Sequence, residues 1–258
     1  MKRIIFSAAI LIAALGFTGC ENDKNGGNLK IDAKVSNGDL VNSQVDEVRA
    51  IGYICVGKYP VDWNEDGIVD WYDCEDYKDI TIATAPFKNG GFKMTLPKKI
   101  DERLLEPMDF EDALEEMPIT VSNKNVKGTA VEDFEAFKNN VNVGYFWCGY
   151  ESRDTEGYLV YLFVDGNCKI SGSFSETEVW DGQTYKMEMS IDLDLKKGWN
   201  AVYQYESEVG TTYTMKVSTK KPSFDYTWYY ENYSYYNAPK KANKKAPTTF
   251  KNLLKIKK

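Results

Sequence analysis

The chain has 258 residues, 43% of them hydrophobic and 14% aromatic, and its 39 acidic residues outnumber 32 basic ones. This acid excess argues against a nucleic-acid partner, because nucleic acid needs a basic protein face. The sequence contains no histidine, which excludes Ser-His-Asp and Cys-His nucleophilic systems and histidine-ligated zinc. We therefore predict a protein that is not an enzyme, since any catalytic site would have to rest on carboxylates, tyrosine or lysine.

Residues 1–19 have the pattern of a secretory signal peptide. Lys2 and Arg3 form a short positive region, and the rest of the segment is mostly apolar. A transmembrane anchor is the alternative, but the apolar run is shorter than the roughly 20 residues that span a bilayer. Residues 17–20, Phe-Thr-Gly-Cys, resemble a bacterial lipobox, which implies cleavage before Cys20 and lipidation of that cysteine. We therefore predict that the protein is attached to a membrane through a lipid anchor.

Residues 20–27 form a polar, glycine-ended stretch that predicts a flexible tether. Without residues 1–19 the net charge is −9, from 30 basic and 39 acidic residues. Acidic residues directly after the lipidated cysteine resemble the surface-export signals of Bacteroidetes lipoproteins. That resemblance implies an outer-membrane lipoprotein of the cell envelope exposed at the surface, while an orientation towards the periplasm stays open.

Alternating apolar and polar residues predict strands in the first half of the chain. They are expected at residues 29–35, 48–56, 80–85 and 92–96, and the last two flank Asn89-Gly90-Gly91, a hairpin signal. Two acidic segments, 107–117 and 129–139, are compatible with helix. We predict short helical connectors there.

A calcium loop is predicted at residues 62–73. Its oxygen-bearing side chains fall at loop positions 1, 3, 5, 9 and 12, and Gly67 stands at position 6, where the chain must turn sharply. The predicted ligands of Ca²⁺ are Asp62, Asn64, Asp66, the carbonyl of Ile68, Asp70 and Asp73. The loop resembles those of dockerins and thrombospondin type 3 repeats, although its last position is Asp rather than Glu. We expect an isolated loop inserted between strands, with millimolar-range affinity; a solvated acidic turn is the alternative.

The second half of the chain has a clearer strand pattern. Strands are expected at 159–164, 168–170, 185–195, 199–205 and 213–217. The fold class predicted is all-β and mainly antiparallel, with one or two β-sandwich-like units at 28–140 and 141–230 and short helical connectors. Residues 89–97 and 193–200 resemble stretches of uncharacterised Bacteroidetes envelope lipoproteins with two β-rich halves.

Four cysteines follow Cys20, namely Cys55, Cys74, Cys148 and Cys168. An even number of cysteines in an exported chain favours disulfides, and four allow three connectivities. We predict local pairing, Cys55 with Cys74 and Cys148 with Cys168. Free buried thiols in strands are the alternative.

Aromatic residues suggest two ligand-facing surfaces. Residues 224–230 contain Trp228 and Tyr230, while Trp63 and Trp71 flank the calcium loop. Exposed rings of this kind stack on sugars, and the alternative is that they fill the core of a last strand. Residues 231–258 follow as a lysine-rich tail, and its composition predicts disorder, with contact to anionic lipid as the alternative.

These features together predict a surface-anchored, non-catalytic binding or adhesion module that is stabilised by calcium and takes a glycan or protein partner. A structural or assembly component of an envelope complex is the second hypothesis. A carboxylate-dependent glycan hydrolase is the third.

Overall fold

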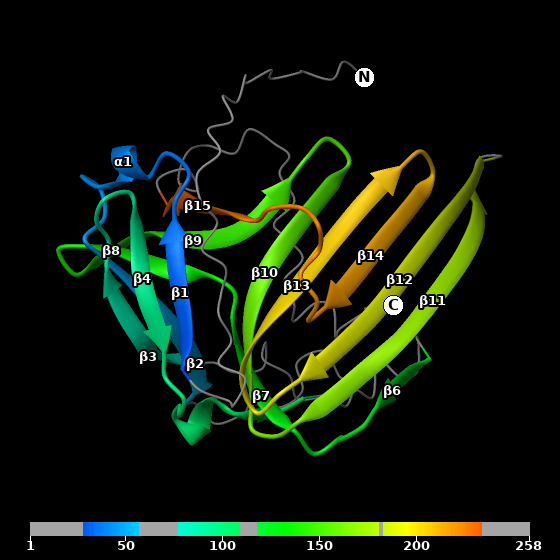
Figure 1. Cartoon of the computed structure of the whole chain (residues 1–258), viewed down its shortest axis with the longest axis horizontal. Coiled ribbons are helices and arrows are strands. Elements are labelled where there is room, and N and C mark those ends of the chain that lie inside the picture. The colour runs from blue at the N-terminus through cyan, green and yellow to red at the C-terminus, as the bar shows by residue number, and fades with distance from the viewer. Residues whose placement is uncertain (1–27, 57–76, 109–117, 181–182, 234–258) are drawn as a thin grey trace.

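The computed structural model in Figure 1 describes residues 28–56, 77–108, 118–180 and 183–233. As predicted, these parts of the chain are mainly β-strand, with one short helix, α1 (Gly38–Val41), and one 3-10 turn, η2 (Glu102–Leu104). Several predicted features lie outside the described residues: Cys20, the calcium loop at 62–73 with Trp63 and Trp71, and Cys74. In the described parts no helix is long and apolar enough to cross a membrane.

The strands fall into an early group and a later group of longer strands. The early ones are β1 (Leu29–Lys34), β2 (Glu47–Cys55), β3 (Tyr77–Pro86), β4 (Gly91–Leu96), β5 (Glu106–Pro107), β6 (Ile119–Val121), β7 (Lys127–Val131) and β8 (Phe134–Lys138). The later ones are β9 (Val141–Glu151), β10 (Thr155–Val164), β11 (Cys168–Trp180), β12 (Gln183–Leu195), β13 (Gly198–Val209), β14 (Thr212–Ser218) and β15 (Thr227–Asn232). All four strands predicted in the first half and all five in the second are present.

The first hydrophobic core lies between the β1–β4 pair and the strands β2, β8, β9, β10 and β15. Alternate residues of β1 point into it, and Leu29 and Ile31 are almost completely buried. A tight turn is present at the predicted place, with positive φ angles at Asn89 and Gly90. The predicted hairpin is wrong, because β4 pairs with β1 and β3 pairs with β2. Trp228 of β15 reaches β1 through a parallel bridge to Val35, so the last strand closes over the first core.

The predicted helical connector at 129–139 is wrong, because β7 and β8 occupy it. Phe134 and Ala136 of β8 are completely buried in the first core, and Glu135 between them faces outward. This period of two buries one face of a strand, and packing of Phe134 outweighs the local helix preference of the acidic residues. Most of the other proposed connector, 107–117, lies outside the described residues.

One sheet of 13 strands runs through both halves of the chain. Its main path is β3-β2-β8-β9-β10-β13-β14-β12-β11-β6, and β7 and β15 pair with β10 and β9 beside it. The ladders are antiparallel except that β14 is inserted between β13 and β12 and runs parallel to β12. The first core draws on residues before and after position 140, for example Phe134 and Phe146. The boundary predicted near residue 140 is therefore crossed by both the sheet and its core.

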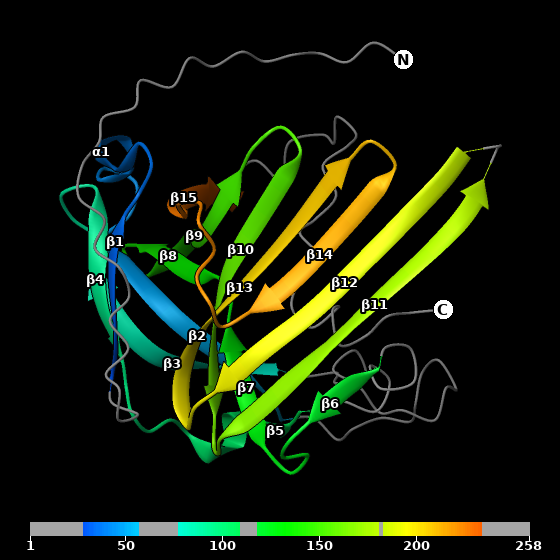
Figure 2. The ribbon, with the colours of Figure 1, turned by 45° about the vertical axis from the view of Figure 1, so that its right-hand side comes forward.

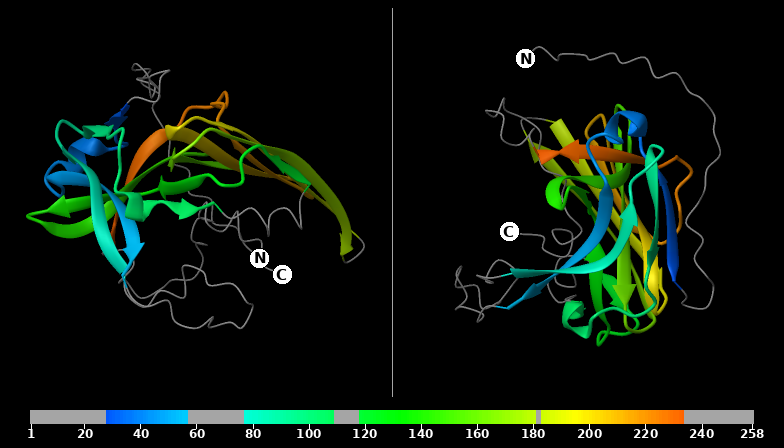
Figure 3. Two further views of the ribbon diagram at one scale, coloured as in Figure 1. Left: turned by 90° about the horizontal axis from the view of Figure 1, so that it is seen from below. Right: turned by 90° about the vertical axis from the view of Figure 1, so that its left-hand side faces the viewer.

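The long strands β10 to β14 form a strongly curved sheet, and the β11–β12 hairpin projects furthest (Figures 2 and 3). One face of this sheet carries the second core, with Val160 of β10, Val202 of β13 and Leu193 of β12 buried in it. The alternate residues of the same strands point to the opposite face. The curved sheet therefore offers two chemically separate surfaces.

The predicted Cys148–Cys168 disulfide is not formed. Cys168 begins β11 inside the second core and has a free thiol, and its Sγ lies 3.3 Å from the carbonyl oxygen of Asn123. Cys148 lies in β9 and belongs to the first core. The two residues are thus buried in different cores. The partner proposed for Cys55 is outside the described residues.

Candidate functional site

The structure buries Trp228 in the first core and packs the partly buried Tyr230 against that core. The ring of Trp228 is 7% exposed and packs edge-on against Phe92 and Phe134, with centroid distances of 5.1 and 5.2 Å. Tyr230 packs against Phe146, and its hydroxyl donates to the carbonyl of Val143 over 3.3 Å. A buried ring offers no face to a ligand, so the core alternative applies to Trp228, whereas Tyr230 is partly exposed and packs on the core with one side.

Tyr229, the residue between Trp228 and Tyr230, faces the other way. Tyr229 of β15 stacks on Trp147 of β9 at a centroid distance of 4.6 Å and an angle of 25°. Trp147 also lies against Tyr158 of β10, with centroids 5.7 Å apart. All three rings are partly exposed. We call this row, Tyr229, Trp147 and Tyr158, the aromatic platform.

Gly149 makes room for the central ring of the platform. A methyl group at this position would lie 2.2 Å from the Trp147 ring and 2.6 Å from the carbonyl oxygen of Gly157. Gly149 is the register partner of both Thr227 in β15 and Tyr158 in β10. The indole therefore lies over a side-chain-free position at the junction of three strands.

Glu231 fixes the orientation of two rings. Its carboxylate accepts a hydrogen bond from the Trp147 indole nitrogen over 3.0 Å and another from the Tyr145 hydroxyl over 2.9 Å. Glu231 and Tyr145 are register partners across β15 and β9, so the sheet itself brings them together. The ring of Tyr233 contacts Tyr145 at 5.9 Å and extends the aromatic area.

A second acid and tyrosine pair lies one strand further along. Glu135 of β8 is the register partner of Tyr145, and it accepts hydrogen bonds from the Tyr53 hydroxyl over 2.9 Å and from the Asn142 side-chain nitrogen over 2.8 Å. Burial raises the pKa of the Glu135 carboxyl, against the opposing effect of the Tyr53 hydrogen bond. Acids and aromatic hydroxyls thus alternate along this surface.

Asp133, directly before β8, has an unusual carboxyl group. The pKa of this carboxyl is raised to about 7, first because desolvation disfavours its charge and then because Glu132, Glu231 and Glu135 repel it. Asp133 is nevertheless accessible to solvent.

Acidic residues also border the platform on its other side. Glu156 of β10 stands directly opposite Glu206 of β13, and these carboxylates accept hydrogen bonds from Tyr158 over 3.1 Å and Tyr213 over 2.7 Å. Desolvation, with the nearby acids, raises the pKa of both hydroxyls above the ordinary tyrosine value. The phenols remain protonated donors at neutral pH.

This arrangement is suited to binding a polyhydroxylated ligand. Flat ring faces can pack on the apolar side of a sugar, and carboxylates at the rim can accept its hydroxyl hydrogen bonds. Among the residues that the structure describes, no three or more Asp, Glu or Cys side chains are grouped to hold a metal ion. The predicted calcium ligands lie outside this part of the chain.

Sequence reasoning singled out Trp228 and Tyr230 and missed Trp147, Tyr158 and Tyr229. One signal was available for Tyr229: in a strand whose even-numbered rings fill the core, the odd-numbered ring must face outward. No local signal could have joined Trp147 to Tyr158 and Tyr229, because the three rings meet only through strand register.

The fold and this surface define an all-β protein with an acid-rimmed row of exposed aromatic rings. No protein family model, curated protein or solved structure matches the chain.

Proposed function

We propose that this protein is a lipid-anchored envelope protein that binds glycans without cleaving them. The observation that carries the proposal is the aromatic platform of Tyr229, Trp147 and Tyr158, three partly exposed rings from three strands. Exposed aromatic and other apolar residues are normally scattered singly over a protein surface. A fixed row of aromatic rings is instead typical of a binding surface.

The platform is rigid enough for recognition. Hydrogen bonds from two rings to Glu231 hold Trp147 and Tyr145 in place before any ligand arrives. A ligand then loses little further entropy in ordering the protein side chains. Acceptors at the rim and an apolar centre match a sugar, whose ring has hydroxyl groups at its edge and C–H groups on its faces.

The sequence supports the location that the proposal assumes. The segment before Cys20 has the pattern of a lipoprotein signal, and a lipid anchor with a polar tether would hold the binding domain at the outer membrane. We also propose that Ca²⁺ binds residues 62–73 and stiffens that insertion. A structural role in an envelope complex stays the alternative, and it requires no glycan.

One observation favours hydrolysis as a second candidate function. The Asp133 carboxyl, with a pKa of about 7, has the proton affinity that a general acid needs near neutral pH. Glu231 and Glu135 are close enough to influence it electrostatically. Hydrolysis of an array glycan that is lost in Asp133→Asn, with binding retained, would support this function over simple recognition.

A glycan array separates these functions. The mature protein, from residue 20 without its lipid, is compared with Trp147→Ala and with Tyr185→Ala, whose exposed ring lies outside the platform on β12. We expect the mature protein and Tyr185→Ala to bind the same defined set of glycans. Trp147→Ala should no longer bind them. Equal binding by all three would contradict the platform assignment, and binding to no glycan would favour a structural role.

A further inference from the structure

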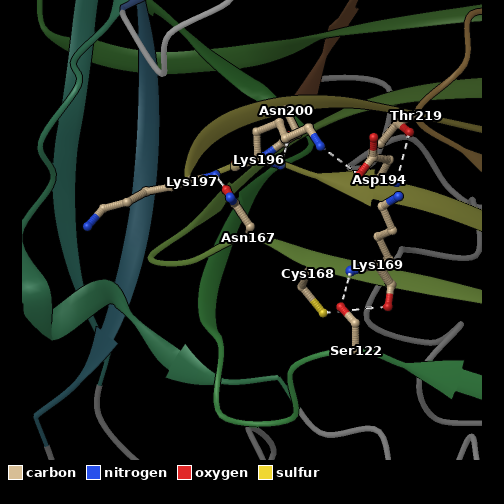
Figure 4. Close-up of polar contacts among 9 residues, drawn as sticks. All are labelled: Ser122, Asn167, Cys168, Lys169, Asp194, Lys196, Lys197, Asn200 and Thr219. Atoms are coloured by element: carbon tan, nitrogen blue, oxygen red, sulfur yellow. Dashed lines mark hydrogen bonds and ion pairs between the residues drawn. The ribbon is translucent and has the colours of Figure 1, made fainter.

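A hollow of about 340 Å³ lies on the other face of the sheet from the platform. It lies where β12 ends at Leu195, β13 begins at Gly198 and the chain leaves β14 after Ser218. Asp194, Asn200 and Thr219 are labelled at this place in Figure 4. Its lining is Asp194, Lys196, Asn200, Ala201, Tyr203, Thr219, Lys220 and Lys221. We call it the lysine hollow.

Hydrogen bonds from a buried side chain shape the turn at one end of the hollow. Asn200 is 4% exposed, and its Nδ2 donates to the carbonyl oxygens of Lys196 over 2.8 Å and Gly198 over 2.9 Å. Its Oδ1 accepts from the Lys196 backbone nitrogen over 2.8 Å. On the other strand, the hydroxyl oxygen of Thr219 accepts from the Asp194 backbone nitrogen over 3.1 Å. Hydrogen bonds to the backbone thus hold the Asn200 and Thr219 side chains in place at the hollow.

The hollow has an excess of positive charge in an acidic protein. Lys196 pairs with Asp194 over 2.8 Å, and Lys220 pairs with Asp192 over 2.6 Å. Lys221 forms no ion pair within the described parts of the chain. Three lysines and one aspartate therefore line the hollow, and the Lys196 hydrogen bond, aided by the charges of Lys196, Lys169 and Lys220, lowers the pKa of Asp194.

The rest of the lining is polar and aromatic. Tyr203 supplies a ring, which is braced edge-on by Tyr226 at 5.3 Å. Asp194 and Thr219 supply oxygen atoms at the hollow. A single ligand unit that carries an anionic group, several hydroxyls and an apolar ring face would use each of these elements.

We propose that the lysine hollow binds an acidic sugar unit, whose carboxylate pairs with Lys221 and Lys196 while its ring packs on Tyr203. The volume lies within the range of about 300–1,000 Å³ that small-molecule pockets occupy. Gln204 of β13 is the register partner of the platform residue Tyr158 and therefore shares its face of the sheet. Because neighbouring side chains of a strand point to opposite faces, Tyr203 lies on the other face. The lysine hollow and the aromatic platform are therefore separate surfaces.

Titration of the isotope-labelled mature protein with D-glucuronate, followed by NMR, tests this assignment. We expect saturable shifts of the Thr219 and Lys221 amide signals with glucuronate and none with D-glucose, its neutral counterpart. Lys221→Gln should weaken glucuronate binding about threefold, as expected for one exposed charge. Lys186→Gln, which removes a lysine paired with Glu188 further along β12, should leave it unchanged.

Each alternative outcome would overturn the proposal. No amide shift with glucuronate would show that the hollow does not bind this sugar. Equal shifts with glucose would show that the carboxylate of the ligand is not recognised. Unchanged glucuronate binding in Lys221→Gln would show that Lys221 does not contact the ligand. A similar loss of binding in Lys186→Gln would indicate a general effect of charge. Inorganic phosphate that binds as tightly as glucuronate would show a simple anion site with no role for the sugar ring.

Discussion

Replacing Trp228 by alanine should destabilise the protein rather than merely weaken ligand binding. The side chain is 7% exposed and contacts Phe92 and Phe134 with centroids 5.1 and 5.2 Å away. Its strand also bridges to β1 at Val35. Removing a buried tryptophan leaves a cavity among rings that can close only in part, which costs about 3–5 kcal/mol.

Urea denaturation followed by far-ultraviolet circular dichroism measures this loss as a change in the free energy of unfolding. Trp228→Phe keeps part of the ring contacts and should lose less stability than Trp228→Ala. Tyr185→Ala serves as the surface control, with an expected change within about 0.5 kcal/mol. A loss below about 1 kcal/mol in Trp228→Ala would refute the placement of this ring in the core.

Three further predictions concern acids. Glu231→Gln should lower the free energy of unfolding by about 1 kcal/mol, because it weakens charge-assisted hydrogen bonds from the Trp147 and Tyr145 side chains. The same variant should change the tryptophan emission spectrum, and an unaltered spectrum would contradict the contact between Trp147 and Glu231. The raised pKa of Asp133 means that the folded state binds more protons than the unfolded state between pH 4 and about 7, so stability falls as the pH rises through that window. Asp133→Asn should therefore exceed wild type at pH 8, by about 1 kcal/mol after solvent screening, and lose this advantage towards pH 4; a pH-independent difference in urea melts would disprove it. Calorimetry of the mature protein should detect calcium binding that disappears in Asp62→Ala/Asp66→Ala, and heats that persist in this variant would exclude the predicted loop.

The alternation of apolar residues predicted the strands well because each strand buries one face. The regular pattern of residues 185–195 corresponds to β12, and Leu193 and Leu195 lie in the second core as that pattern requires. The turn at Asn89-Gly90 was also predictable, because few residues tolerate positive φ angles. These are local properties of the chain.

The features that failed or were missed depend on distant partners. Residues 134–138 have a composition compatible with helix, yet β2 and β9 pair with them on both sides. Insertion of β14 between β12 and β13 depends on which strand edges are available. The aromatic platform likewise requires the register of β9, β10 and β15, which no short segment specifies.

The central claim is that a glycan binds on the aromatic platform. Isothermal titration of the tightest-binding array glycan into wild-type protein, Trp147→Ala and Tyr185→Ala tests it most directly. We predict that Kd rises about tenfold or more in Trp147→Ala, as expected when a central aromatic residue of a binding surface is removed, and stays unchanged in Tyr185→Ala. The same Kd for Trp147→Ala and wild type, with both proteins folded, would contradict the claim.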